Sequence, residues 1–245
     1  AGFTGEEIKR RVEEMGLASD FIDLPNGYSR INVKMKDFDG TEINGQGPDI
    51  SPEETERLLR KLDSLKEEDV LVLAGSIPRT MPDSIYSDIL KRLEGKGILA
   101  VVDATGELLL HVLEYRPFLI KPNNHELGEI FQVKLETRED VVPYARKMQE
   151  KGARNVLVSM AGQGAVLLDE KGQVHMLPAP KGKLVNAVGA GDSMVAGFLA
   201  GWLTKKDYEY AFRMGISAGS ASAFSENLAT KEEVEEVFRQ VSQSA

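Results

Sequence analysis

Apolar and polar positions divide the chain into two kinds of segment, and their regular succession predicts alternating strands and helices. Uninterrupted apolar runs at 69–75 and 98–104 are typical of strands that are buried on both faces of a parallel sheet. Shorter apolar runs at 118–120 and 155–160 follow at similar intervals. The segments between these runs have helical spacing, and we expect helices at 82–95, 105–114, 123–131 and 137–151.

The later part of the chain continues this pattern with a hairpin and three helices. Residues 164–177 read as two strands that turn at 169–172, and helices are expected at 191–203, 207–224 and 231–243. Alternation of strand and helix predicts an α/β fold, in which a doubly wound, mostly parallel sheet carries helices on both faces.

One segment near the start breaks the alternation. Residues 29–35 alternate polar and apolar side chains, Asp39-Gly40 is a hairpin turn signal, and a second strand-like segment follows at 42–48. We expect a small β lid here, because mobile flaps of this kind commonly cover active sites.

Helix starts are predicted from capping boxes, in which a hydroxyl residue precedes an acidic residue by three positions. The pairs are Thr4 with Glu7, Ser51 with Glu54, and Thr230 with Glu233.

Composition excludes several kinds of protein. The 245 residues carry a formal net charge of -9, which argues against nucleic acid as the main partner. Cysteine is absent from the sequence, so disulfides and thiolate chemistry are excluded, and the 3 histidines are too scattered for a histidine-rich metal site. A membrane span needs about 20 consecutive apolar residues, and no run approaches that length. With no signal peptide in view, we expect a cytoplasmic protein without a membrane partner.

The most informative motif lies at 186–198, where Gly189, Ala190 and Gly191 precede a helix and Asp192 stands in its first turn. The free N–H groups of a helix start bind oxyanions, and a carboxylate beside them suits the deprotonation of a hydroxyl that attacks the anion. Two alternatives remain at this point. Asp192 could serve as an ordinary helix cap, or the motif could be a dinucleotide fingerprint, although Met194 stands where its third glycine belongs.

Polar clusters follow each predicted strand, at the end where ligands bind in open α/β sheets. The clusters occupy 75–78, 121–126, 159–164 and 189–192. Their common placement predicts a small-molecule site. Asn123 and Glu126 could form a helix cap, hold a hydrated Mg²⁺, or do both. Lys121 could be a solvated strand end or a phosphate ligand, and Arg30 and Asn32 could be exposed strand residues or bind a phosphate.

The motifs together resemble the ribokinase-like carbohydrate kinases of the PfkB family, over nearly the whole chain. The residues that carry the resemblance are SRIN at 29–32, EINGQGP at 42–48, LAGSIP at 73–78, VDATGE at 102–107, KPNNHELGE at 121–129, VSMAGQGA at 158–165, KLVNAVGAGDSMVAGF at 183–198 and GSASAFSENLAT at 219–230. VGAGD together with KPNxxE is strongly specific for the family, and EINGQGP and AFSENLAT point to its branch that acts on fructose 1-phosphate.

The resemblance implies a role for each matching residue. Asp192 would be the catalytic base, and the amides of Gly189, Ala190 and Gly191 would form an anion hole for the transferring phosphoryl group. Glu126 would order Mg²⁺ and its waters. The residues implied to contact ATP are Lys121, Asn123, Ser159, Met160, Gly162, Gln163, Gly164 and Gly191.

The remaining implied contacts concern the sugar and a second cation. Arg30, Asn32 and Ser76 would hold the sugar phosphate. A monovalent-cation site, for K⁺, would involve Asn186, Val188, Ser222 and Ser225. A homodimer is expected, because lids of this family often pair between subunits.

The sequence departs from the family at its start. Family members carry a further N-terminal segment with a first core strand and a substrate loop, so we expect the sequence to be a fragment. The expected domains are a truncated start of the core at 1–20, a β lid at 21–48 and a ribokinase-like nucleotide-binding core at 49–245.

The expected activity is ATP-dependent phosphorylation of D-fructose 1-phosphate to fructose 1,6-bisphosphate. The alternatives are the same chemistry on tagatose 6-phosphate or fructose 6-phosphate, and a truncated, non-catalytic sugar-phosphate-binding protein. A dinucleotide-dependent oxidoreductase is a more distant rival, which the glycine pattern disfavours.

Overall fold

The apolar runs form a six-stranded sheet whose strands follow one another in chain order. Its strands are β3 (Val70–Ala74), β4 (Leu99–Asp103), β5 (Leu119–Ile120), β6 (Asn155–Ser159), β7 (Ala165–Leu168) and β8 (Val174–Leu177). The pairs from β3 to β6 are parallel, whereas β7 and β8 are antiparallel to their neighbours. The predicted mostly parallel sheet and the predicted hairpin are therefore confirmed.

The computed structural model describes residues 1–34 and 42–243, and the chain divides into two units. The first unit comprises Ala1–Glu67 and Ser76–Ile98, and the second comprises Glu68–Gly75 and Leu99–Ala245, with the whole sheet in the second. The domain boundaries expected at residues 20 and 48 remain a prediction.

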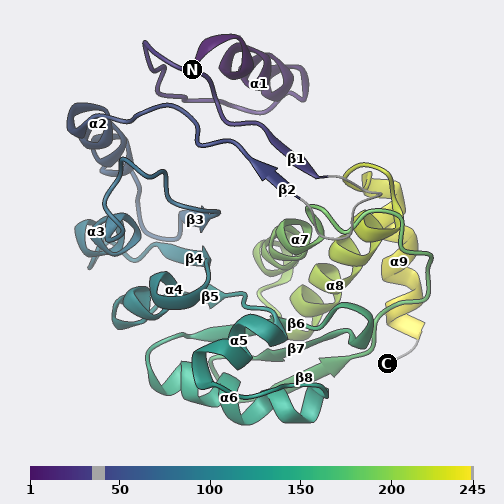
Figure 1. The fold of residues 1–245 in the computed structure, drawn as a ribbon. Helices are drawn as coiled ribbons and strands as arrows, with labels where there is room; N and C mark the ends of the chain where they lie inside the picture. Colours follow the sequence, from purple (N-terminus) through teal and green to yellow (C-terminus); the bar gives the residue numbers. More distant parts are fainter. Residues whose placement is uncertain (35–41, 244–245) are drawn as a thin grey trace. The chain divides into compact units, whose positions relative to one another are not determined.

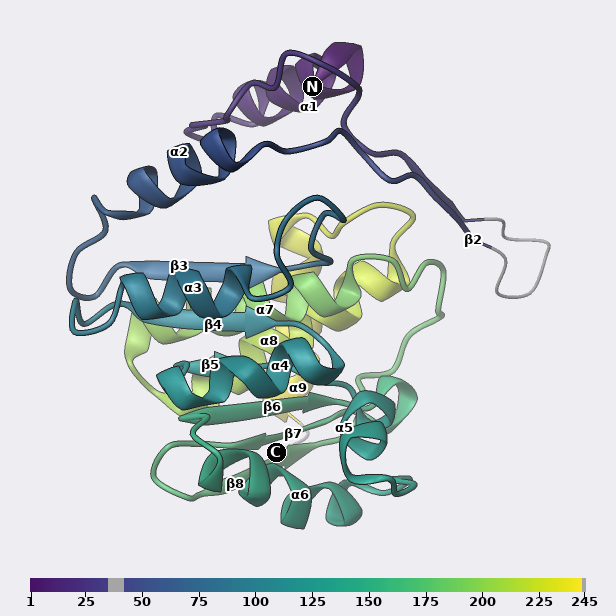
Figure 2. The same ribbon diagram turned by 60° about the vertical axis from the view of Figure 1, so that its left-hand side comes forward.

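Helices cover both faces of the sheet in the second unit, as Figures 1 and 2 show. One face carries α4 (Gly106–Val112), α5 (Asn124–Phe131) and α6 (Arg138–Glu150), and the other carries α7 (Ala190–Lys205), α8 (Tyr208–Phe224) and α9 (Lys231–Gln243). Short 3₁₀ turns occur at Leu113–Tyr115 and Ala161–Gln163. This two-sided arrangement confirms the doubly wound fold class.

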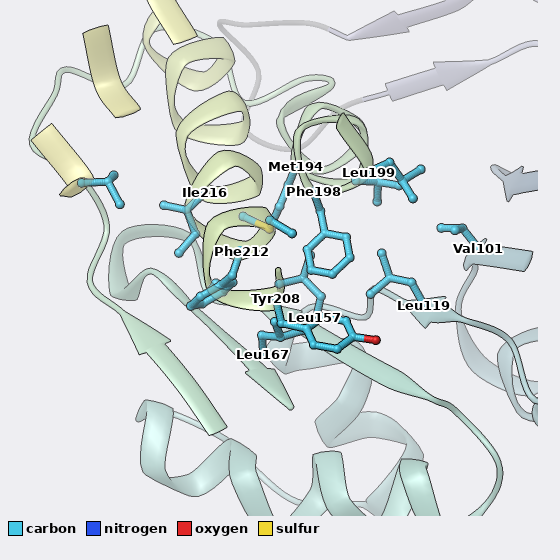
Figure 3. Packing of buried hydrophobic residues seen from close by; sticks show 14 of the residues in the cluster. Val101, Leu119, Leu157, Leu167, Met194, Phe198, Leu199, Tyr208, Phe212 and Ile216 are labelled. Carbon is cyan, nitrogen blue, oxygen red and sulfur yellow. The ribbon is translucent and has the colours of Figure 1, made fainter. Parts of the chain in front are cut away.

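A buried apolar cluster joins the sheet to α7 and α8 (Figure 3). Leu119 and Leu157 project from adjacent strands toward Phe198 of α7 and Phe212 of α8. All four residues are fully buried. Each such side chain contributes about 1.5–3 kcal/mol when it leaves water. The cluster therefore fixes α7 on the sheet, and with it the motif at the start of that helix.

Glycines let α7 and α8 approach each other closely. A Cβ added at Gly197 would lie 2.5 Å from the carbonyl oxygen of Met214 and 2.6 Å from Cβ of Ala218. On the facing helix, a Cβ at Gly219 would lie 2.9 Å from the carbonyl oxygen of Ala190. Larger side chains at these positions would push the helices apart.

Capping boxes start several of the helices. Ser51 and Glu54 cap α2 (Pro52–Leu62), and Thr230 and Glu233 exchange the same pair of hydrogen bonds before α9, so these two predictions are confirmed. The predicted box of Thr4 and Glu7 is wrong. The helix α1 (Gly2–Glu14) begins earlier, and the Thr4 hydroxyl donates to the carbonyl oxygens of Ala1 and Ser29.

Thr137→Ala is expected to lower the free energy of unfolding by about 1 kcal/mol, because it removes the capping acceptor of α6. The Thr137 hydroxyl accepts from the Asp140 amide at 3.2 Å. Chemical denaturation measures the loss, and Thr204→Ala near the end of α7 serves as a control with a change below about 0.5 kcal/mol. Equal losses in the two variants would contradict a special role for the cap.

The first unit contains α1, α2, α3 (Ile85–Arg92) and a small antiparallel sheet of β1 (Asn32–Lys34) and β2 (Glu42–Asn44). The register pairs Asn32 with Asn44. These strands agree with the predicted lid strands, while the predicted Asp39-Gly40 turn lies outside the described residues. No helix in the described part of the chain has the length and apolarity needed to cross a membrane.

Candidate active site

The carboxyl ends of β4, β5 and β6 bring three predicted polar segments to one edge of the sheet. Because these strands are parallel, Asp103, Lys121 and Ser159 all stand at strand ends on that edge. Asn123 forms an isolated parallel bridge with Ser159, and the Ser159 amide donates to the carbonyl oxygen of Pro122. The loop after β5 is therefore held against the end of β6.

Asn123 and Glu126 form a capping box at the start of α5. The Glu126 amide donates to Asn123 Oδ1, and the Asn123 amide donates to Glu126 Oε2, both at 2.8 Å. The predicted helix cap is thus confirmed, and both side chains remain partly exposed at this edge of the sheet. Capping uses one carboxylate oxygen of Glu126, so its other oxygen could still face a hydrated cation.

Lys121 forms an ion pair with Asp103, the last residue of the neighbouring strand. Lys121 Nζ lies 3.2 Å from Asp103 Oδ1, and the two side chains are only 8% and 18% exposed. Burial raises the pKa of the Asp103 carboxyl above its usual range, and the Lys121 ammonium opposes that rise. The carboxylates of Asp192 and Glu126 also raise the pKa of Asp103, which places all these charges in one electrostatic cluster.

The start of α7 has the backbone geometry of an anion site. Gly189 precedes the helix with a φ of +79°, a left-handed conformation that glycine adopts without strain. The Ala190 amide donates to the carbonyl oxygen of Ala187 at 3.2 Å. The amides of Gly191 and Asp192 follow in the first turn, where helix geometry directs N–H groups out of the helix end.

Gly191 connects this helix start to the charged cluster. A Cβ added at Gly191 would lie 3.3 Å from Lys121 Nζ, so the ammonium group stands directly against the first turn of α7. The Asp192 side chain, one residue further on, is exposed and accessible to a ligand. A lysine, two outward-facing amides and a carboxylate thus meet at one place.

The segment Ser159–Gly164 combines buried and exposed residues. Met160 is 3% exposed, whereas Gly162 and Gln163 lie on the surface. Gly164 has a φ of +93°, and a Cβ there would lie 2.0 Å from the carbonyl oxygen of Leu177. Packing against β8 therefore requires glycine at 164, in addition to the nucleotide contact that the sequence predicts.

The predicted monovalent-cation residues lie around the end of α8. Ser222 is 3% exposed, and its hydroxyl donates to the Ser193 hydroxyl at 2.8 Å and accepts from the Ala229 amide. The Ser225 hydroxyl bonds to Ala221 and Glu233, and Asn186 Oδ1 accepts from the Val188 amide. These contacts brace the segments on either side of the α7 start.

The predicted sugar-phosphate residues belong to the first unit. Arg30 Nη1 donates to the Ser76 hydroxyl at 2.8 Å, so the structure brings these two side chains together. Asn32 is exposed on β1. Within the described residues, no group of three or more histidine or acidic side chains could hold a metal by itself. A cation at Glu126 would thus depend on water and phosphate oxygens for its other ligands.

Sequence reasoning quoted Asp103 within a family motif but gave it no part in the site. The available signal was a carboxylate at the end of an apolar strand run, where burial is costly unless a partner is present. Its partner, Lys121, stands at the end of the next predicted strand.

Known proteins resemble this chain over nearly its full length. A family model for pfkB family carbohydrate kinases matches residues 1–235. A 1-phosphofructokinase of Bacillus subtilis is 49% identical over 240 residues, which cover 98% of this chain and 78% of the relative. A D-tagatose-1-phosphate kinase of Bacillus licheniformis is 31% identical over 98% of this chain and 79% of its own length. A solved Staphylococcus aureus structure, described as a phosphofructokinase, superposes with a TM-score of 0.87 at 37% identity and covers 98% of this chain and 78% of that one.

Proposed function

Because the chain belongs to the pfkB family of carbohydrate kinases, we propose that it transfers the terminal phosphoryl group of ATP to fructose 1-phosphate. The product is fructose 1,6-bisphosphate. The observation that carries the proposal is the meeting of Lys121, the Gly191 amide and Asp192 at the start of α7. The name of the 49% identical relative supports the choice of acceptor.

The residues at this edge of the sheet fit a nucleoside triphosphate and a divalent cation. Lys121 supplies positive charge, the amides of Gly191 and Asp192 supply donors, and Glu126 has a second carboxylate oxygen that the capping bond does not use. When bound, Mg-ATP supplies the phosphoryl group, with its charge partly neutralised by the metal. Met160, Gly162 and Gln163 would line the nucleotide pocket beside Ser159.

Asp192 acts as the base in this proposal. Its carboxylate accepts the proton of the sugar hydroxyl at carbon 6 as that oxygen bonds to the γ-phosphorus. The bond between the γ-phosphorus and its bridging oxygen breaks, and ADP leaves. The amides of Gly191 and Asp192 donate to the transferring oxygens, and Lys121 offsets their negative charge. Since the Ala190 amide already donates to Ala187, its part in this anion hole is smaller than that of Gly191.

The phosphate already on the sugar needs a separate cationic partner. Arg30 is suited to it, because a guanidinium binds phosphate through two parallel hydrogen bonds. Ser76 orients the guanidinium by accepting from Nη1, and Asn32 adds an amide from the lid strand β1.

Arg30→Ala is expected to raise the KM for fructose 1-phosphate by about 10-fold or more, with a much smaller change in kcat. A lost charge-assisted hydrogen bond of about 1.5–3 kcal/mol underlies this value. Steady-state kinetics at saturating ATP measures it. Arg60→Ala, on the exposed surface of α2, is the matched control and should leave the KM unchanged. A KM that is the same in both variants would contradict the assignment of Arg30.

A panel of acceptors tests the activity itself. ADP release is measured with Mg-ATP and fructose 1-phosphate, tagatose 1-phosphate, fructose 6-phosphate, tagatose 6-phosphate or free fructose. Selective turnover of fructose 1-phosphate supports the proposal. Faster turnover of tagatose 1-phosphate would favour a second candidate function, a tagatose-1-phosphate kinase, which the name of the 31% identical relative suggests. Binding of sugar phosphates without turnover would identify a non-catalytic binding protein.

We propose further that Mg²⁺ is the divalent cation at Glu126 and that K⁺ binds beside Asn186 and Ser225. We also propose that β1 and β2 pair two copies of the chain into a homodimer. The carboxylate of Glu126 supports the first assignment, and the side-chain oxygens of Asn186 and Ser225 support the second. Exposed apolar side chains on the small sheet, Val33 and Ile43, support the pairing. A cytoplasmic location would accompany this metabolic activity.

A further inference from the structure

Strand register brings Asp103 and Lys121 together. The parallel pairing of β4 with β5 sets Val102 opposite Ile120, so the next residue on each strand is Asp103 and Lys121. The Lys121 amide also donates to the carbonyl oxygen of Val102 at 3.4 Å. Both side chains leave neighbouring strand ends at the same edge of the sheet, which makes their ion pair a direct result of the sheet's register.

Lys121 would be poorly defined in position without this partner. A lysine side chain has four rotatable bonds and a point charge that can adopt many directions. Lys121 is only 7% exposed, and Asp103 Oδ1 accepts from its ammonium at 3.2 Å. That hydrogen bond fixes the ammonium, which carries further N–H groups for another acceptor. The free side of Lys121 Nζ lies against Gly191.

Charge balance points to the same role. Asp103 is itself largely buried, and a buried carboxylate is stable only beside a cation or several donors. This pair lies beside the outward-facing amides of α7, with Asp192 and Glu126 near enough to act on the Asp103 charge.

We propose that Asp103 is a positioning residue, which holds the Lys121 ammonium against the first turn of α7 so that it meets the transferring phosphoryl group. This role rests on the proposed kinase function. Asp103 does not contact the reacting atoms. It acts through Lys121, and its effect therefore depends on the presence of that lysine.

Asp103→Asn is expected to lower kcat by about 10-fold, while the KM for fructose 1-phosphate stays near its wild-type value. Asparagine keeps the size and one acceptor oxygen but loses the charge, so the ammonium is held less firmly, and small misplacements of catalytic groups reduce rates strongly. Asp103→Ala removes the acceptor as well and should lower kcat further. Steady-state kinetics and the unfolding temperature are measured for both variants.

Asp169→Asn provides the matched control. Asp169 is 1% exposed and lies 3.0 Å from His175 Nε2, so it is also a buried carboxylate with a basic partner, in the β7–β8 hairpin. This control should lose stability while kcat stays unchanged. If both variants lose kcat in proportion to their loss of stability, Asp103 has only a structural role and the proposal is overturned.

A double-mutant cycle with Lys121→Met separates positioning from independent effects. In the Lys121→Met background, Asp103→Asn should cause almost no further loss of kcat, because the group that it holds is gone. Equal losses in the two backgrounds would overturn the proposal.

Nucleotide binding distinguishes a failure of this inference from a failure of the proposed function. ATP and adenosine are titrated calorimetrically into the wild type and Asp103→Asn, with no sugar present. Weaker binding of ATP with unchanged binding of adenosine supports the positioning role, even if no ketose phosphate is turned over. Unchanged binding of both ligands, together with unchanged kcat, overturns it. Wild-type protein that binds no ATP would overturn both proposals.

Discussion

Asp192→Asn is expected to lower kcat by about 10³-fold or more, with little change in ATP binding. Asparagine fills the same space but cannot accept the proton of the sugar hydroxyl, and general-base catalysis contributes about 10²–10⁴-fold. Single-turnover measurement of fructose 1,6-bisphosphate formation reports the chemical step directly. Because the side chain is exposed in the first turn of α7, the variant should fold normally.

Asp140→Asn is a matched control for this experiment. Asp140 occupies the third position of α6, as Asp192 does in α7, and its carboxylate accepts hydrogen bonds at the start of that helix. The control should lose a little stability with the capping bond and retain full kcat. Its own pKa is lowered by hydrogen bonds from Thr137 and Glu136, so the stability that it contributes is present at neutral pH and lost as the pH falls through that lowered pKa. Similar kcat in the two variants would exclude Asp192 as the base.

Gly197→Val is expected to lower the free energy of unfolding by about 3 kcal/mol or more, a fall in Tm of roughly 6–12 °C. Even a single Cβ at this position would lie 2.5 Å from the backbone oxygen of Met214, which cannot rotate away as a flexible side chain could. The helices must separate, and the buried contacts of Phe198 with the sheet weaken. Thermal unfolding followed by circular dichroism measures the change.

Ala196→Val is the matched control. It introduces the same residue, valine, one position earlier on α7, where the side chain is exposed. Helix propensity alone predicts a loss of roughly 0.5 kcal/mol there. A similar Tm for the two variants would show that α7 and α8 have room between them, contrary to the structure. Any loss of kcat in Gly197→Val beyond its loss of folded protein would report a displaced Asp192.

Local patterns in the sequence were sufficient for much of the fold. Asn123 and Glu126 are three residues apart, and such spacing determines a capping box without help from the rest of the chain. The apolar runs likewise predicted the strands, because burial on both faces leaves no room for polar alternation. Gly189 and Gly191 identified the start of α7 for a similarly local reason.

Contacts between distant residues were beyond such patterns. Thr4 has the spacing of a cap, yet its hydroxyl donates to the carbonyl oxygens of Ala1 and Ser29. The residues around Thr4 in the sequence do not indicate that Ser29, 25 positions later, lies beside it. Glu7, its supposed partner, is instead bound by Arg10 and Arg11. The Asp103–Lys121 pair was missed for the same reason, since it depends on the register between two strands.

Gly164 illustrates a third kind of information that sequence alone did not carry. Its place in a glycine-containing loop suggested only a nucleotide contact. The structure adds the collision that any side chain would have with the carbonyl oxygen of Leu177. A backbone requirement and a ligand requirement can thus select the same residue, and the chain itself does not say which one dominates.

The chain order of the strands has a consequence for how the protein is made. Each strand of the six-stranded sheet hydrogen-bonds to the next one in sequence, so each pairing can form as soon as the later strand of the two has been made. A growing chain leaves the ribosome from its N-terminus, and the sheet can therefore assemble strand by strand during synthesis. Asp192 emerges only after β8. The proposed base is thus made only after the sheet on which its helix docks, and we expect unfinished chains that lack it to have no phosphoryl-transfer activity.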